Sequence, residues 1–221
     1  NGFPSKRNED WKFSDLREIV SKNFSELNFK TTNSTSDKVN FIKDFDHNSI
    51  VIINGELVSS NFKHEDKGKI RVDNFLNENF SEKKELNPLV NLNHALANKG
   101  YSLIVDDNYI FKKVLVIYNL FTNDLNQNIL NSSNEVVVGK NSELHTIEFT
   151  INKSEKNFFN NVYEKTILKE SAVFKNICVQ NERSQGYFHK FAKNRLSSKS
   201  NFSSFIFPSG LKFNKLDLEF D

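Results

Sequence analysis

A repeated step of 29 residues in the C-terminal half constrains the fold more than any other feature of this sequence. Short runs of β-forming residues follow one another after Gly100, and positions of similar character recur along them. The recurring positions are Ser142, Ser171 and Ser200; Leu144, Val173 and Phe202; Phe149, Cys178 and Phe207; Val162, Phe191 and Phe220; and the pairs Phe159 with Phe188 and Ile167 with Leu196. A fixed step with apolar residues in register is typical of stacked coils, because each coil buries its apolar side chains against the next. We therefore predict that residues 100–221 are mainly β and form a right-handed parallel β-helix, with Leu144, Val173 and Phe202 in one inward column.

The expected strands lie at 103–105, 114–118, 136–138, 144–151, 162–168, 173–179 and 202–207, and residues 216–221 alternate in the same way. Residues 1–99 have a different character, which predicts an α-helical or mixed N-terminal region. Apolar residues recur at three- and four-residue steps over 10–29, and residues 73–98 also have a helical pattern, with Pro88 opening a last helix and Gly100 as its C-terminal cap. Asn54-Gly55, after the β-branched run 50–53, predicts a hairpin.

Composition excludes several classes of function. The net charge of the 221 residues is +2, and the basic residues are mixed with acidic ones, so we do not expect nucleic acid as a partner. No apolar run approaches the roughly 18 residues that span a bilayer, and a single cysteine forms no internal disulfide. These features predict a soluble cytoplasmic protein that does not insert into a membrane.

Cys178 and the five histidines are the first candidates for chemistry. Cys178 is aligned with Phe149 and Phe207, so we expect it to be buried in the core and unreactive. The histidines are His47, His64, His94, His145 and His189, and no two of them have the spacing of a metal pair on one helix. His145 and His189 could still meet on adjacent coils.

Two short motifs are the remaining candidates. Gly139-Lys140-Asn141-Ser142 is similar to the end of a phosphate-binding loop, but Asn134 replaces the first glycine, and Asn141 replaces the Ser or Thr after the lysine. Asp106-Asp107 is a carboxylate pair of the type that binds Ca²⁺ on β-helical polysaccharide lyases, but no acids follow one period later, which favours a solvated turn. We therefore predict no catalytic, cofactor-binding or metal-binding residues, and we expect that this chain is not an enzyme.

The N-terminal segment carries a resemblance to a known family. It reads Gly2-Phe3-Pro4-Ser5-Lys6-Arg7-Asn8-Glu9-Asp10-Trp11-Lys12-Phe13-Ser14-Asp15-Leu16. This segment resembles the N-terminal signature of the SufB/SufD family of iron–sulfur cluster assembly scaffolds, and within that family the SufD type. The helix and glycine of 87–100, the repeated segments 142–149, 171–180 and 200–207, and the segment 210–220 resemble later parts of the family in the same order. Lys113 and Lys215 stand where the family commonly has proline and arginine.

The resemblance implies a non-catalytic scaffold subunit of the SufBCD complex. Its partners would be a SufB-like subunit and the SufC-like ATPase, and the full complex, rather than this chain, would assemble the iron–sulfur cluster. The absence of methionine and an ending on strand pattern lead us to expect a fragment that lacks the later coils and the C-terminal helical region that docks SufC. The alternatives are a SufB-type subunit of the same complex and a β-helical carbohydrate-active or structural protein.

Overall fold

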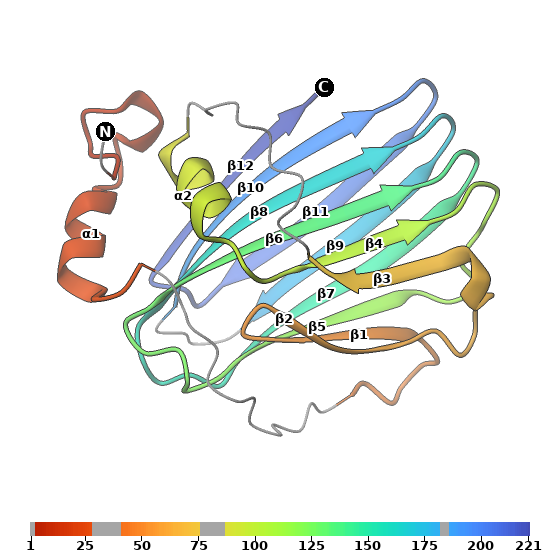
Figure 1. Cartoon of the computed structure of the whole chain (residues 1–221), viewed down its shortest axis with the longest axis horizontal. Helices are drawn as coiled ribbons and strands as arrows, with labels where there is room; N and C mark the ends of the chain where they lie inside the picture. Colours follow the sequence, from red (N-terminus) through yellow and green to blue (C-terminus); the bar gives the residue numbers. More distant parts are fainter. Residues whose placement is uncertain (1–2, 28–40, 76–86, 182–185) are drawn as a thin grey trace.

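Two six-stranded sheets face each other in the computed structural model, which describes residues 3–27, 41–75, 87–181 and 186–221 (Figure 1). Helices occur only before Gly100 in the described chain, and most of the strands follow it. In chain order the elements are η1 Glu9–Trp11, α1 Leu16–Asn23, β1 Asn48–Ile53, β2 Glu56–Asn61, η2 Lys67–Lys69, β3 Ile70–Asn74, α2 Pro88–Leu96, β4 Tyr101–Val105, β5 Leu115–Phe121, β6 Ile129–Val138, β7 Glu143–Asn152, β8 Phe158–Leu168, β9 Val173–Asn181, β10 Gly186–Leu196, β11 Asn201–Ser209 and β12 Phe213–Phe220.

The strands of the C-terminal part alternate between the two sheets, so each consecutive pair of strands forms one coil. One sheet has the order β11-β9-β7-β5-β1-β2, and the other has the order β12-β10-β8-β6-β4-β3. Neighbouring strands from β4 to β12 pair in parallel, which is the arrangement of stacked coils. The chain is therefore a β-solenoid of about 4 turns after a short helical and mixed region, as the repeat predicts.

Antiparallel strands form the N-terminal edge of both sheets. β1 and β2 form the hairpin predicted at Asn54-Gly55, where both residues have positive φ angles of 48° and 80°. Such angles are required by the tight turns that suit the twist of a hairpin. β3 pairs antiparallel with β4 and closes the second sheet in the same way.

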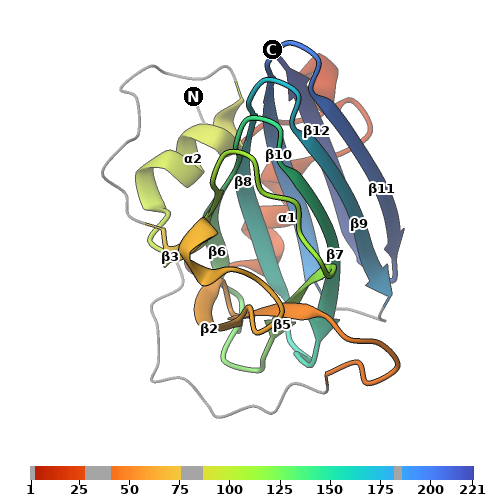
Figure 2. The same ribbon diagram turned by 90° about the vertical axis from the view of Figure 1, so that its right-hand side faces the viewer.

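α2 lies over the outer face of the sheet that contains β6, β8, β10 and β12, and α1 lies near the starting ends of these strands, where its apolar residues pack with Ile129 and Phe159 (Figure 1). Asp15 caps α1 by accepting a hydrogen bond from the Glu18 amide, and Asn87 caps α2 through the Leu89 amide, with Pro88 in the first turn. Figure 2 shows α2 on the side of β6 and β8, away from β9 and β11. Capping side chains and an N-terminal proline are the expected start signals for these helices.

The helical predictions need two corrections. The pattern over 10–29 forms a 3₁₀ turn, Glu9–Trp11, and the short helix α1. The range 73–98 contains the end of β3 and the predicted helix from Pro88. Residues 76–86 lie outside the described part. Gly100 is not a helix cap, because α2 ends at Leu96 with Ala97 as its cap. Gly100 has a φ of +126° and lies so close to β6 that a Cβ atom there would be 1.8 Å from the Ser133 carbonyl oxygen. The glycine is needed for this close approach of two backbones.

Over β7, β9 and β11 the 29-residue step is an average of two different coil lengths. β7 pairs with β9 at a step of 30, so Leu144 lies beside Phe174, and β9 pairs with β11 at a step of 28, so Phe174 lies beside Phe202. The predicted column is therefore wrong at its middle member, because Val173 points outward. A one-residue shift exchanges the two faces of a strand.

The same shift changes the alignment of Cys178. Its neighbours across the sheet are Glu148 and Ile206, and the predicted partners Phe149 and Phe207 flank Val179 instead. Cys178 nevertheless points into the interior and is buried, as expected. Phe149, Val179 and Phe207 lie on the opposite, outward side of this sheet.

The interior between the sheets changes character along the strands. Near the turns that lead from β4 to β5, β6 to β7 and β8 to β9 it is filled by aliphatic and aromatic side chains, which we call the apolar half: Leu103, Leu115, Val138, Leu144, Leu168 and Phe174. Further along the same strands the inward positions are mostly polar, and we call this region the polar half: Glu148, Asn160, Glu164, Cys178, Gln180 and Lys190. Both halves are built by the same strands and differ only in side-chain chemistry.

Candidate functional site

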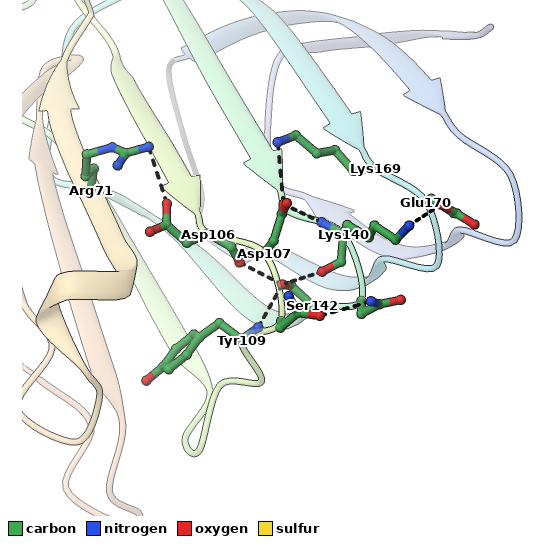
Figure 3. Close-up of polar contacts among 10 residues, drawn as sticks. Arg71, Asp106, Asp107, Tyr109, Lys140, Ser142, Lys169 and Glu170 are labelled. Carbon is green, nitrogen blue, oxygen red and sulfur yellow. Dashed lines mark hydrogen bonds and ion pairs between the residues drawn. The ribbon is translucent and has the colours of Figure 1, made fainter.

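The two motifs singled out in the sequence come together at one end of the coils (Figure 3). Asp106 and Asp107 follow β4, and the turn 139–142 follows β6 and lies beside them. The Lys140 amide donates to Asp107 Oδ1 at 2.8 Å, and the Ser142 hydroxyl donates to the Asp106 carbonyl oxygen at 2.7 Å. Ser142 Oγ also accepts from the Tyr109 amide at 2.9 Å. These bonds join one turn to the next.

The turns repeat one backbone conformation from coil to coil. Asn108, Asn141, Ser171 and Lys199 all have φ angles between 55° and 59°. Each of the first three donates its amide to the next turn: to the carbonyl of Lys140 at 2.7 Å, of Glu170 at 3.0 Å and of Ser198 at 3.0 Å. Asparagine tolerates this left-handed conformation better than most residues, which fits its presence in the first two turns.

The charged side chains around these turns pair with one another. Arg71 lies 3.4 Å from Asp106, Lys169 lies 3.5 Å from Asp107, and Lys140 lies 2.6 Å from Glu170 (Figure 3). The Lys140 amide and the nearby Lys169 charge lower the pKa of the Asp107 carboxyl. This cluster is therefore built to hold the turns in register.

Neither motif has the geometry of the site that it resembles. Gly139–Ser142 joins two strands, whereas a phosphate-binding loop joins a strand to a helix. A Cβ atom on Gly139 would lie 2.5 Å from the Asp107 amide nitrogen, so the glycine serves the packing of adjacent turns. Within the described ranges, no group of three or more His, Cys, Asp or Glu side chains is arranged to hold a metal ion.

A second cluster of ionisable side chains lies in the polar half of the interior. Lys190 on β10 and Glu164 on β8 form an ion pair of 2.6 Å, with only 11% and 12% of their side chains exposed. Burial alone would lower the pKa of the Lys190 amine, but the carboxylates of Glu164 and Glu148 raise it above its usual value. Lys190 therefore remains charged inside the solenoid.

Cys178 and Glu148 face this ion pair from the opposite sheet. The Cys178 thiol lies 3.4 Å from Glu148 Oε2 and accepts from Asn176 Nδ2 at 3.3 Å. Burial raises the pKa of the thiol, and the charge of Glu148 raises it further. Because the thiolate is the reactive form, Cys178 is held in its unreactive state.

The structure does not bring His145 and His189 together. His145 lies on the outer face of β7, where its Nε2 atom is 2.7 Å from Glu143 Oε1, and His189 belongs to the other sheet. His189 is fully buried, with Nδ1 2.9 Å from Asn161 Oδ1 and Nε2 3.0 Å from Asp217 Oδ2. Burial lowers the pKa of His189, and the hydrogen bonds that Asp217 receives from His189 and Lys215 outweigh burial and lower the pKa of its carboxyl.

His189 lies beneath the N-terminal motif. Trp11 is 4% exposed, and its ring centroid lies 6.0 Å from that of His189 and 6.4 Å from that of Phe213. The ammonium group of Lys215 lies 4.9 Å from the centre of the Trp11 ring, a cation–π contact. The motif is thus anchored on β10 and β12 through its tryptophan.

Sequence reasoning missed the charged residues of the polar half. Glu148, Glu164 and Lys190 stand at inward positions of their strands, where charged residues are rarely found unpaired. The available signal was the alternation of inward and outward residues along β8 and β10. It assigns these residues to the interior only when the strand limits and the coil lengths are known. The sequence named His189 as a candidate but did not reveal its partner Asp217, which lies beside it on the outer face of the sheet.

The structure therefore defines a β-solenoid with a structural ladder of turns and a polar, ion-paired region inside it. Comparison of the sequence with protein-family models and with curated protein sequences found no match in either set. Within the described part of the chain, no helix is long and apolar enough to cross a membrane.

Proposed function

We propose that this chain is a non-catalytic, cytoplasmic scaffold subunit of the SufBCD iron–sulfur cluster assembly complex, of the SufD type. The observation that carries the proposal is the place of the N-terminal motif in the structure. Trp11, the most distinctive residue of the motif, is buried against β10 and β12, which joins the helical region to the solenoid. A helical region followed by a solenoid is also the order of elements that the family resemblance implies.

The chemistry of the polar half supports a scaffold more than an enzyme. The Cys178 thiol has a raised pKa, and the Lys190 amine is paired with Glu164. At the turns, Asp106 pairs with Arg71, and Asp107 is engaged by the Lys140 amide and by Lys169. One buried cysteine does not supply the several thiolates that an iron–sulfur cluster usually needs, so the cluster would be assembled by the full complex.

Affinity purification from the cell that makes the protein tests this proposal. The tagged protein should co-purify with a SufB-like subunit and a SufC-like ATPase, and a tagged SufB-like subunit should recover it in return. Recovery of the SufC-like ATPase with this chain alone would favour the SufB-type alternative. Recovery of neither subunit, in both directions, would overturn the proposal and leave a β-helical structural protein as the better reading.

A further inference from the structure

A cavity of about 250 Å³ lies in the polar half, between β7, β9 and β11 on one side and β10 and β12 on the other. Part of its wall is apolar, from Phe188, Ile206 and Leu216, and part is polar, from Glu148, Gln180 and Lys190. Pro208 and Asn214, which also line it, belong to the last two strands of the described chain and are exposed. A cavity with apolar walls and convergent polar groups is the usual form of a small-molecule site.

The charges around the cavity do not balance. Lys190 faces two carboxylates, Glu164 at 2.6 Å and Glu148, so these three side chains together carry one net negative charge. The hydrogen-bond donors to Glu148 among the described residues are neutral: Asn119 Nδ2 at 2.7 Å and the Cys178 thiol at 3.4 Å. A half-buried carboxylate in this position favours a cation next to it.

An unpartnered acceptor lines a separate, narrow recess beside the cavity. Glu148, Thr150, Phe188 and Lys190 line both the cavity and the recess. Asn160 also lines the recess; it is 5% exposed, and its Oδ1 atom has no hydrogen-bond partner. Since buried acceptors are nearly always paired, a donor from a bound molecule fits this position.

We propose that this cavity is a binding site for a small organic cation. An ammonium or guanidinium head donates hydrogen bonds to Glu148 and Asn160 Oδ1, and a short apolar body packs against Phe188 and Leu216. The aromatic face of Phe188 adds to the attraction for a cation. This inference does not depend on the role in cluster assembly proposed above.

The apolar walls distinguish an organic cation from a bare metal ion or water. An inorganic cation is coordinated by oxygen atoms all round, and Phe188, Ile206 and Leu216 offer none. Water would satisfy Asn160 but would gain little from these walls. A ligand with both a donating head and an apolar body satisfies both parts of the lining.

Titration of the 221-residue chain with n-butylammonium chloride, followed by isothermal calorimetry and by amide NMR shifts, tests the proposal. n-Butanol and sodium butyrate, which share the apolar body and differ in charge, serve as comparison ligands. We expect n-butylammonium to bind with a dissociation constant of about 1 mM or tighter, n-butanol at least about tenfold more weakly, and butyrate not at all. Equal binding of the alcohol and the ammonium, or displacement of the ammonium by potassium at constant ionic strength, would overturn the proposal.

Two variants and one control variant locate the site. Glu148→Gln removes the charge and keeps the shape, and it should weaken n-butylammonium binding at least about tenfold. Glu143→Gln removes the same charge from the outward side of the same strand and should leave binding unchanged. Leu216→Trp fills the cavity without changing its charge and should abolish binding, which decides the question if Glu148→Gln does not fold. Unchanged binding by folded Glu148→Gln or Leu216→Trp contradicts the site.

Discussion

The two halves of the interior are built from the same strands, yet they contribute to the molecule in different ways. The apolar half buries Leu103, Leu115, Leu144 and Leu168 completely, which is the ordinary source of stability in a fold. The polar half buries an ion pair, an amide without a partner and a thiol, and it leaves a cavity. Burying charges in this way rarely increases stability. The comparison indicates that the apolar half holds the coils together. The polar half contributes little to stability and provides the cavity instead.

Breaking the buried ion pair should give the largest effect. Lys190→Met leaves the Glu164 carboxylate buried without its partner and should lower the free energy of unfolding by about 3–5 kcal/mol. Urea denaturation followed by circular dichroism measures the change. Lys165→Met is the matched control, because Lys165 pairs with Glu135 at 2.9 Å with about a third of each side chain exposed, and it should cost less than about 1 kcal/mol.

Replacing both members of the pair sharpens this test. Glu164→Leu with Lys190→Met removes both charges and should restore the free energy of unfolding to within about 1 kcal/mol of the original protein. If the single Lys190→Met variant is as stable as the original, the pair is solvated and the contrast between the halves is wrong.

Truncation in the apolar half should give the next largest effect. Leu144→Ala removes a fully buried side chain between Phe174 and the opposite sheet, and it should cost about 2–4 kcal/mol through lost burial and the cavity that remains. Ile147→Ala on the same strand faces outward and should cost less than about 1 kcal/mol. Equal losses for the two variants would mean that the alternation of faces on β7 is misassigned.

Raising the pH should change the free energy of unfolding through the polar half and not through the apolar half, by a smaller amount than the substitutions above. The pKa of Lys190 in the folded chain is raised above 10.5, so its contribution is complete below pH 10.5 and is lost as the pH rises toward the folded-state pKa. Near pH 11 the original protein should lose about 1 kcal/mol relative to the variant with Glu164→Leu and Lys190→Met. The pKa of Tyr101 is also raised, and the largest cause, burial, is the same in both proteins. Leu144→Ala should follow the original protein, and urea denaturation from pH 8 to 11 checks both expectations.

Replacing the thiol should give the smallest effect. Cys178→Ser places a hydroxyl between Asn176 and Glu148, where both a donor and an acceptor are present. We expect the free energy of unfolding to change by less than about 1 kcal/mol, since the surroundings are already polar. A loss as large as that of Leu144→Ala would place Cys178 energetically in the apolar half.

The coil architecture was predictable because it depends on the mean spacing of the strands and not on the length of each coil. Runs of β-forming residues and a mean step near 29 identify stacked coils even though the steps between paired strands range from 26 to 33 residues. The alignment of single residues was not predictable, as Val173 and Cys178 show. Cys178 was expected to be buried beside Phe149 and Phe207; it is buried, but beside Glu148 and Ile206.

The contents of the polar half could not be derived from the sequence. Lys190 lies beside Val162 and Leu216 at steps of 28 and 26, so its distance from Glu164 depends on how each loop between strands is folded. β10 itself was not predicted, because Lys190, Lys193 and Arg195 make it look like a surface segment. The hairpin at Asn54-Gly55 and the helix from Pro88 were predictable, because their signals are local.

The ladder of left-handed residues at the turns has a consequence for the length of the molecule. Asn108, Asn141, Ser171 and Lys199 each begin the next coil from the same backbone geometry, and each coil contacts mainly its two neighbours. A segment such as 143–172, which contains β7, β8 and the following turn, is therefore a modular unit. Inserting a second copy would lengthen the stack by about 4.8 Å, the spacing of neighbouring strands, without requiring a new type of turn. The protein can therefore be lengthened by whole coils, each of which adds one strand spacing to the stack.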